Sequence, residues 1–317
     1  MSGSSHDGGD VVWAVVVCYR PDLGQLGRLL EALQHQVAGI VVVDNGPDER
    51  LQNWLAPRTD ERLVHYAMGG NFGVARGHNA GITAVRARGA THAILFDQDS
   101  LPAPDMVARL MAAVVDATAR GDRVASAGPS FRDPRDGTVY PFIRLAGWKI
   151  ERVREPDRTG AQGEPSYCLA DYLITSGCLV PLAALDAVGG MEDELFIDYI
   201  DIEWGLRARA KGYVNLGVFD AHMEHDLGDP PRRYFGGRLR VPMHSPLRHY
   251  YHFRNALRLY TRGYIPLRWR LNDGYRLLLK GVFYSLCVEN SREQRRMILR
   301  GCRDGIAGVT GPYSPAS

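Results

Sequence analysis

Three short apolar runs, each ending in a polar residue, constrain the fold of this chain most. They occupy residues 11–19, 39–44 and 92–97. Short apolar runs bounded by turn residues are typical of buried strands. The interval between the first two runs has helical spacing, at Leu26, Leu29, Leu30 and Leu33. Strands that alternate with helices predict an α/β fold, with a mostly parallel central sheet flanked by helices and ligands at the carboxyl ends of its strands.

Polar residues at the ends of these runs would gather along one edge of the sheet. Tyr19, Asp44 and Asp97 hold such positions, and a glycine-rich turn at 69–73 opens a predicted helix at 74–88. Since helix N-termini attract anions, this turn could hold a phosphate. Asp44 could accept hydrogen bonds from a ribose or a pyrimidine, or could serve only to form its own turn. The first run is not followed by G-x-G-x-x-G, which argues against a dehydrogenase.

Asp97 and Asp99 stand one residue apart at the end of the third run, just before a Leu-Pro turn. In an extended chain such residues point to the same side. Two converging carboxylates repel each other unless a cation lies between them, and a hard divalent cation prefers oxygen ligands. Such a cation could also hold a diphosphate. The alternative is an ordinary acidic turn that caps the next helix.

A second group of acidic residues comprises Asp198, Asp201 and Glu203. Asp201 is predicted to be the N-cap of a helix that stops at Gly212. A carboxylate at a helix N-terminus, kept ionised by the helix dipole and facing a cleft, could act as a general base. The alternative is a simple cap with a solvated glutamate nearby.

His222 and His225 lie among four carboxylates, just before a Pro-Pro pair. A lone histidine is usually structural, but two in such surroundings are better ligand candidates. His225 could therefore bind a metal ion or a phosphate. Arg232 and Arg233 in the following loop could reach phosphates.

Composition is that of an ordinary globular protein. The 317 residues are 45% hydrophobic and 23% charged, enough for one large or two small domains. Five scattered cysteines favour free thiols in a reducing compartment. No apolar run reaches the roughly 18 residues of a membrane-spanning helix, and no signal peptide is recognisable. We expect disorder in residues 1–10 and a long loop at 133–163.

Charge is distributed unevenly along the chain. The net charge is +2, yet residues 246–303 hold 13 Lys and Arg against 3 Asp and Glu, a net of +10 that leaves −8 elsewhere. Apolar side chains recur there at helical steps, at Leu271, Tyr275, Leu278, Val282 and Leu286. This pattern predicts a helix that either packs on the core or lies on an anionic membrane surface. No nucleic-acid-binding module is recognisable.

Together these motifs resemble the inverting glycosyltransferase family 2, of the GT-A fold, and within it the bacterial rhamnosyltransferases. The carrying residues lie at 15–19, 43–46, 70–81, 96–100, 175–177, 198–204 and 225–229. The resemblance covers roughly residues 11–260. It implies a GT-A domain over 11–245, followed by a helical basic extension at 246–317. Within the domain, a Rossmann-like half at 11–100 would bind the nucleotide sugar, and a half at 101–245 would bind the acceptor and carry out catalysis.

The resemblance also implies residue roles. Asp201 matches the second position of the family's Glu-Asp base motif, but Ile200 replaces the glutamate, so Asp198 and Glu203 stay open as alternative bases. The metal ligands would be Asp97, Asp99 and His225, holding Mg²⁺ or Mn²⁺. The nucleotide-sugar contacts would be Tyr19, Asp44, Asn71, Gly73, Arg76, Asp97 and Gln98, with Asp44 on the pyrimidine. The acceptor contacts would be Ser176, Gly177, Glu203 and Trp204, with Trp204 stacked on a sugar.

The expected activity is metal-assisted, inverting transfer of L-rhamnose from dTDP-β-L-rhamnose to a hydroxyl of a bacterial surface glycan. The acceptor would be a glycan or a lipid-linked glycan, met in the cytoplasm or at the cytoplasmic face of the inner membrane. Alternative donors are UDP-sugars of galactofuranose, glucose or N-acetylglucosamine. Alternative functions are a non-catalytic sugar-nucleotide or glycan-binding protein, and a nucleotidyltransferase that releases pyrophosphate. The sequence leaves the linkage and any oligomer open.

Overall fold

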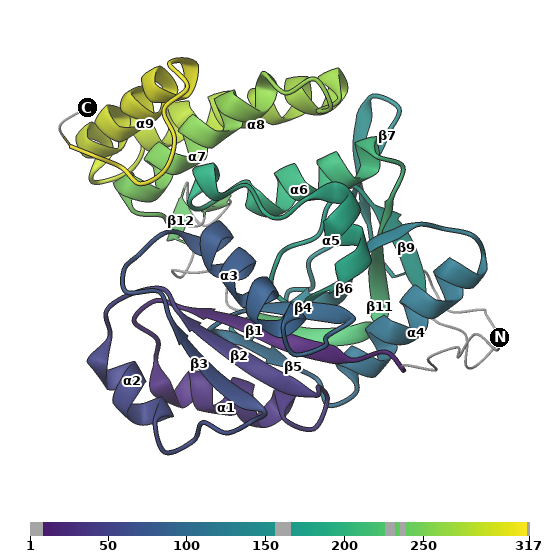
Figure 1. The fold of residues 1–317 in the computed structure, drawn as a ribbon. Coiled ribbons are helices and arrows are strands. Elements are labelled where there is room, and N and C mark those ends of the chain that lie inside the picture. The colour runs from purple at the N-terminus through teal and green to yellow at the C-terminus, as the bar shows by residue number, and fades with distance from the viewer. Residues whose placement is uncertain (1–8, 156–165, 226–231, 235–238, 242, 316–317) are drawn as a thin grey trace.

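The computed structural model describes residues 9–155, 166–225, 232–234, 239–241 and 243–315 (Figure 1). Nine strands in these residues form one sheet: β1 (Val12–Cys18), β2 (Gly39–Asp44), β3 (Leu63–Ala67), β4 (His92–Asp97), β5 (Ser100–Pro102), β6 (Val124–Arg132), β9 (Tyr167–Ala170), β10 (Cys178–Pro181) and β11 (Val214–His225). Their order is β3-β2-β1-β4-β10-β6-β11-β5, with β9 paired to β11.

The sheet is mostly parallel, as predicted. β1 runs parallel to β2 and β4, β2 to β3, and β6 to β11. Antiparallel pairing enters with β10, β5 and β9. The carboxyl ends of β1, β2 and β4 therefore lie on one edge, as the alternation of strands and helices predicts.

Helices cover both faces of the sheet. One layer comprises α1 (Leu23–Leu33), α2 (Glu49–Leu55) and α4 (Met106–Ala119), and the other α3 (Val74–Arg86), α5 (Leu182–Val188) and α6 (Ile200–Ala210). Alternate residues of β1 pack against the two helix layers. Val15 and Val17 belong to the core on the α3 side, whereas Ala14 and Val16 belong to the core on the α1 side. Burial of β1 on both faces explains its uninterrupted apolar sequence.

Two glycines let α3 lie directly on the sheet. A Cβ atom on Gly77 would come within 2.8 Å of Val17, and one on Gly81 would collide with Val15. The close approach fixes the direction in which the N-terminus of α3 points, towards the edge that carries Asp44 and Asp97.

The predicted loop at 133–163 contains secondary structure. Strands β7 (Phe142–Ala146) and β8 (Lys149–Val153) form an antiparallel hairpin within it. The prediction of one long loop is therefore wrong for this stretch. The hairpin is tied to the main sheet, because Asp171 N donates to Ile143 O at 2.8 Å and Leu145 N donates to Asp171 Oδ2 at 2.6 Å. Such long-range contacts leave no periodic signal in the sequence.

The C-terminal segment forms α7 (Pro246–Tyr260), α8 (Leu267–Leu286) and α9 (Ser291–Ile306), which lie beyond α6 in Figure 1. Side chains of α7 and α8 share the core of the α3 side, among them Phe253, Trp269 and Tyr284. A short hairpin of β12 (Arg232–Tyr234) and β13 (Leu239–Val241) precedes α7. No helix among the described residues is long and apolar enough to cross a bilayer.

Candidate active site

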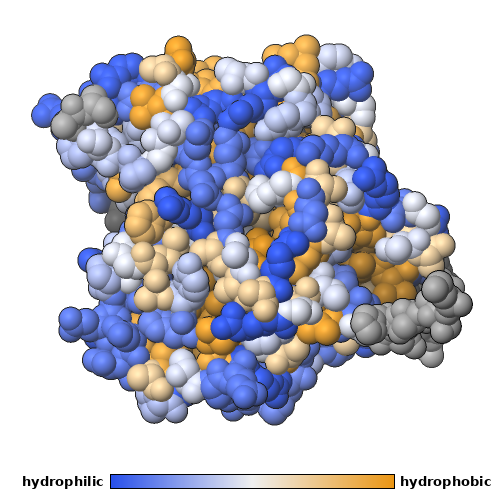
Figure 2. All heavy atoms as spheres, viewed as in Figure 1, coloured by the Kyte–Doolittle hydropathy of each residue, from blue (hydrophilic) through white to orange (hydrophobic). Residues whose placement is uncertain are grey.

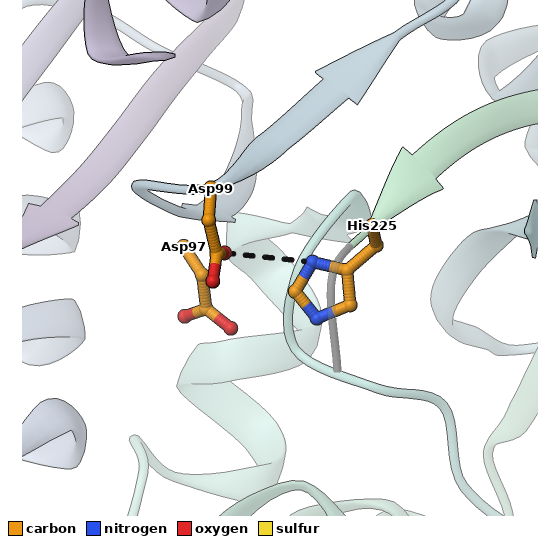
Figure 3. Close-up of side chains that lie close together, drawn as sticks. All are labelled: Asp97, Asp99 and His225. Carbon is orange, nitrogen blue, oxygen red and sulfur yellow. Dashed lines mark ion pairs between the residues drawn. The ribbon is translucent and has the colours of Figure 1, made fainter. Parts of the chain in front are cut away.

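Asp97, Asp99 and His225 form one cluster at the edge of the sheet (Figure 3). Asp97 ends β4, Asp99 lies in the turn to β5, and His225 ends β11. β5 pairs with β11 so that Ser100 lies opposite His225, which brings the histidine beside the two aspartates. One ligand atom from each residue lies within 4.8 Å of the others. Two carboxylates and an imidazole in this arrangement fit a divalent cation such as Mn²⁺ or Mg²⁺.

Buried hydroxyl groups orient this cluster. The Ser100 Oγ lies 2.9 Å from His225 Nδ1 and 2.5 Å from the Ser176 Oγ. Ser176 Oγ also accepts a hydrogen bond of 3.1 Å from the backbone N–H of Asp97. The same Nδ1 lies 3.6 Å from Asp99 Oδ1, so the hydroxyl contact fixes the orientation of the imidazole beside the aspartates (Figure 3). Ser176, predicted to bind the acceptor, is 1% exposed and instead links β4 to the histidine.

Asp201 is the second residue of α6, not its N-cap as predicted. The N-cap position belongs to Tyr199, whose backbone is left-handed with φ of 67°. The Asp201 carboxylate accepts from the N–H of Ile202 at 2.9 Å. Burial, together with the charges of Asp198 and Asp97, raises the pKa of Asp201 to about 6. Loss of hydration on burial thus outweighs the hydrogen bond from the Ile202 N–H in setting this pKa.

Asp198 has the opposite electrostatic environment. Its carboxylate lies 3.2 Å from Nη2 of Arg248. Burial alone would raise the pKa of Asp198, but Arg248 and His252 outweigh burial, and the pKa lies below its usual value. Two nearby carboxylates with opposite pKa shifts divide acid–base roles between them. Asp201 is the better proton acceptor, and Asp198 stays a fixed anion paired with arginine.

The loop before α6 is strained and clamped. Phe196, Asp198 and Tyr199 all have positive φ, between 63° and 67°. Asn255 Nδ2 donates to the carbonyl oxygens of Leu195, Ile197 and Asp198, at 2.9, 2.7 and 3.0 Å.

Arg254 adds a contact at the start of the same loop, where Nη2 donates to Leu195 O at 2.9 Å. Both clamping side chains are 0% exposed. Non-glycine residues with positive φ persist only where their surroundings hold them. We therefore regard Arg254 and Asn255 as positioning residues for Asp201.

Comparison with known proteins agrees with this geometry. The chain matches the profile described as glycosyl transferase family 2 over residues 13–163. It is 31% identical over 300 residues to the dTDP-rhamnosyl transferase RfbF of Shigella flexneri, which covers 95% of this chain and 97% of the relative. The chain belongs to glycosyltransferase family 2.

A second relative of this family 2 enzyme is the N-acetylglucosaminyl-diphospho-decaprenol L-rhamnosyltransferase of Mycobacterium tuberculosis (strain ATCC 25618 / H37Rv). The two are 27% identical over 286 residues, covering 83% of this chain and 92% of the relative. Both relatives are named as enzymes that transfer rhamnose. A glycosyltransferase activity therefore follows from the family and its relatives together.

Solved structures show the same fold. The crystal structure of GalNAc-T7 with UDP, GalNAc and Mn²⁺ matches with a TM-score of 0.60 and 15% identity, over 92% of this chain and 55% of that chain. The present chain thus spans about half the length of that protein. Staphylococcus aureus TarS 1–349 matches with a TM-score of 0.58 and 14% identity, over 93% of this chain and 81% of that chain. At such identities the likeness shows the GT-A fold alone.

Three predicted donor contacts of the glycosyltransferase meet at the sheet edge. Asp44 ends β2 and is 3% exposed, with Oδ1 accepting from the N–H of Gly46 at 3.2 Å. Burial raises its pKa. The backbone N–H of Tyr19 donates to Gln98 Oε1 at 2.8 Å, which joins the ends of β1 and β4. The ring of Tyr19 is 43% exposed beside them.

The glycine-rich turn has a structural task. Gly73 has φ of 88°, and a Cβ there would collide with the backbone of Phe196. The N–H of Val74 donates to Phe196 O at 2.8 Å, and that of Gly73 donates to Asn71 Oδ1 at 3.1 Å. The N–H groups of Gly73 and Val74 are thus occupied within the protein, and a phosphate at this turn stays a prediction. The exposed Arg76 stacks over Phe72, 4.8 Å from its ring centroid.

Two predicted acceptor contacts are engaged inside the protein. Glu203 is 0% exposed, and its carboxylate contacts Arg207 Nε at 2.7 Å and the Tyr264 hydroxyl at 2.6 Å. Trp204 is 4% exposed and donates from its indole to Gly189 O at 2.8 Å. Neither side chain offers a free surface to a sugar, and a carboxylate held by two donors is a poor base. Gly177 packs against Pro129 and Met223.

Sequence reasoning missed the residues of α7 that reach the site. Arg248 pairs with Asp198, and with Asp97 and Asp99 also close by, the pKa of this guanidinium rises. No role was predicted from the sequence for Arg254 or Asn255. The side chains of Arg232 and Arg233 and residues 226–229 lie outside the described residues. An aromatic and basic stretch with an Arg-Asn pair was the available signal.

Proposed function

We propose that this enzyme transfers L-rhamnose from dTDP-β-L-rhamnose to an acceptor hydroxyl with inversion of the anomeric configuration. The observation that carries the proposal is the cluster of Asp97, Asp99 and His225 at the end of β4, with Asp201 in a small pocket that Leu95 of the same strand also lines. A proton acceptor and a site for a metal-bound diphosphate thus lie together. The name of the 31% identical relative supports dTDP-rhamnose as the donor.

The proposed reaction is one displacement. The acceptor oxygen forms a bond to the anomeric carbon while the bond from that carbon to the diphosphate oxygen breaks. Asp201 accepts the proton of the acceptor hydroxyl, and the nucleoside diphosphate leaves with the bonding electrons. A divalent cation held by Asp97, Asp99 and His225 would supply positive charge for the leaving diphosphate. Arg248 adds a fixed positive charge on the same side.

A pKa of about 6 suits the role of Asp201. The carboxylate is ionised at neutral pH and yet more basic than an exposed aspartate. One base is enough, because inversion needs no covalent intermediate.

We propose a lipid-linked glycan acceptor on the basis of the second relative, whose name specifies a diphospho-decaprenol substrate. The outer face of α8 supports contact with a membrane surface. Its apolar side chains are between 50% and 68% exposed: Leu267, Leu271, Tyr275, Leu278, Leu279, Val282 and Leu286. Packing on the core is done by other residues of α8, namely Trp269, Leu277 and Tyr284.

The neighbouring helix α9 carries exposed basic residues. Figure 2 shows apolar side chains along the upper edge, where α8 and α9 lie. The exposed arginines of α9 include Arg292, Arg295, Arg296 and Arg303. A helix face of this kind beside cationic residues suits an anionic membrane surface.

The proposed activity is tested by nucleoside diphosphate release from a panel of sugar nucleotides, with Mg²⁺ or Mn²⁺. We expect dTDP release from dTDP-β-L-rhamnose to exceed UDP release from UDP-galactofuranose, UDP-glucose and UDP-N-acetylglucosamine. Preference for a UDP-sugar would overturn the donor and keep the mechanism. Metal-dependent binding of a donor with no turnover in the presence of any acceptor would favour a sugar-nucleotide-binding protein. Release of pyrophosphate would indicate a nucleotidyltransferase.

A further inference from the structure

A cavity of about 450 Å³ lies between the end of β6 and the β7–β8 hairpin. No role was predicted for it. Its lining is mainly apolar and aromatic, and it includes Phe131, Tyr140, Tyr172 and Leu173 together with Arg152 and Arg154. Phe131 and Tyr140 stack with ring centroids 5.0 Å apart. The cavity is large enough to hold a sugar and its linking group.

The cavity lies beside both parts of the proposed active site. On one side, the Phe131 ring meets His225 edge-on, with ring centroids 6.1 Å apart. On the other, Leu173 lines the cavity and also lines a small pocket that contains Asp201. Tyr172 packs on Gly205, one helical turn after Asp201. Burial, and after it the charge of Asp201, raises the pKa of Tyr172.

The walls of the cavity are fixed from two directions. Asp171, next to Tyr172, pairs with Arg209 of α6 and accepts from the hairpin backbone at Leu145. At the hairpin tip, Asn272 of α8 donates to Trp148 O at 3.2 Å, and Arg268 of α8 lies over the Trp148 ring at 4.6 Å. In Figure 1 the hairpin rises from the sheet towards α8. The cavity is therefore preformed and leads towards the helix with the exposed apolar face.

The lining suits one kind of ligand. Aromatic faces pack against the C–H faces of sugars, and arginine forks bind phosphate oxygens in pairs. Arg152 and Arg154 both stand on β8 or directly after it and are exposed. Arg154 Nη1 lies 3.5 Å from Val139 O, across the cavity lining. Aromatic walls with two cations fit a sugar attached to a diphosphate.

We propose that this cavity is the acceptor site, and that it takes a sugar linked through a diphosphate to a lipid. The inference rests on the proposed glycosyl transfer. The sugar would lie between the Phe131–Tyr140 stack and Tyr172, with the hydroxyl that attacks the donor carbon directed at Asp201. Arg152 and Arg154 would bind the diphosphate, and the lipid would leave along the hairpin towards α8.

The test compares two acceptors that differ only in the diphosphate: N-acetylglucosamine joined to a decyl chain through a diphosphate, and decyl N-acetylglucosaminide. The double variant Arg152→Ala/Arg154→Ala is measured beside Arg144→Ala. Arg144 lies on the same hairpin but pairs with Glu151 and does not line the cavity. We expect the double variant to raise the KM of the diphosphate acceptor at least about tenfold, since charge-assisted hydrogen bonds are lost. The KM of the donor and that of the neutral acceptor should change less than about twofold.

Each other outcome is informative. An unchanged KM for the diphosphate acceptor would overturn the proposal, as would an equal rise for both acceptors. A rise in the KM of the donor alone would indicate that Arg152 and Arg154 bind the diphosphate of the donor instead. If the wild-type protein transfers to neither acceptor, a binding titration with the diphosphate probe decides, and no saturable binding to the wild type contradicts the inference. Donor-dependent dTDP release without acceptor would show that the proposed function survives such a failure.

A second variant fills the cavity. Val139 lines it and is 47% exposed, so Val139→Trp adds bulk at the mouth without opening the core. We expect acceptor turnover to fall at least about fivefold while donor hydrolysis persists and the thermal midpoint stays within about 2 °C. Full acceptor turnover in a folded Val139→Trp protein would contradict the proposal.

Discussion

Two regions hold the proposed site residues by different means: the sheet edge with Asp44 and Asp97, the donor edge, and the loop at 194–199 before Asp201, the base loop. Asp44 and Asp97 are the last residues of regular strands, so neighbouring strands set their positions. Asp201 follows a loop with three non-glycine residues of positive φ, held from outside by Arg254 and Asn255. Strand ends need little additional support, whereas an irregular loop depends on its clamps. Substitutions should therefore act locally at the donor edge and over long distances at the base.

Asp201→Asn is the substitution that we expect to distinguish the two regions most strongly. The amide cannot accept the hydroxyl proton, and we expect transfer to fall about 10³-fold, within the range for loss of a general base. Metal-dependent donor binding should persist, because Asp97, Asp99 and His225 are unchanged. Transfer rates and a donor titration measure both effects, with the exposed Asn53→Ala as control. A transfer rate within tenfold of that of the wild type would show that Asp201 is not the base.

Asp99→Ala instead removes a predicted metal ligand from the donor edge. We expect a loss of more than about 100-fold in turnover and loss of metal-dependent donor binding, since even outer partners of metal ligands are worth about 10–100-fold. Chelation with EDTA should have the same effect on the wild type, reversed by Mn²⁺ or Mg²⁺. Calorimetric titration of Mn²⁺ into both proteins measures the metal site directly. Turnover that survives EDTA would contradict a metal-assisted mechanism.

Asn255→Ala tests the long-range support of the base. Three carbonyl oxygens of the strained loop lose their shared donor, and Asp201 loses its fixed position. We expect kcat to fall about 10–100-fold while the donor KM changes little, because an unpaired buried group is costly but the donor edge is untouched. The pH profile of the variant should also shift, which a general loss of stability would not cause. Equal losses in kcat and in donor affinity would mean that the clamp serves the whole domain.

The pH dependence should report Asp201. With a pKa of about 6, the carboxylate is protonated below that pH, so kcat/KM should fall about tenfold per pH unit below 6 and level off above it. The residual activity of Asp201→Asn should lack this step.

Stability should move in the opposite direction. An unfolded aspartate loses its proton near pH 3.9, before the folded one does, so the free energy of unfolding falls as pH rises from about 4 to about 6. Asp201→Asn should therefore melt at a higher temperature than the wild type at pH 7 and not at pH 4. Identical melting temperatures at pH 7 would show that burial does not perturb this carboxylate.

Glutamates on the outer face of α8 should have the smallest effect on turnover of a soluble donor. Leu271, Leu278 and Leu286 point away from the core, so Leu271→Glu/Leu278→Glu/Leu286→Glu should fold and keep donor hydrolysis within about twofold. Binding to vesicles with anionic lipid should fall at least about tenfold, as charges are poorly tolerated in an apolar contact. Co-sedimentation with such vesicles measures the bound fraction of each protein. Equal vesicle binding by both proteins would contradict the membrane proposal.

The same comparison explains which features could be predicted from sequence. The sheet followed from apolar runs. The convergence of Asp97 and Asp99 was predicted from the two-residue period of a strand, whereas the structure reaches it through the turn after β4, in which Asp99 lies. The hairpin in 133–163 could not be predicted from the sequence, because the groups that anchor it, Asp171 and α8, are far away in the chain. Nor could the deep burial of Glu203, which depends on Tyr264. Asp201 was found by motif, while its raised pKa needed the spatial positions of Asp198 and Asp97.

The clamp on the base loop includes residues that are synthesised late. Arg254 also donates to Gly311 O, and the N–H of Gly311 donates to Glu194 O at 2.9 Å. A nascent chain could therefore fold its sheet and bring its metal ligands together while the loop at 194–199 still lacks its partners. The full set of clamp contacts can form only when residues up to 311 have left the ribosome. Unfinished chains would hold nucleotide sugars without consuming them.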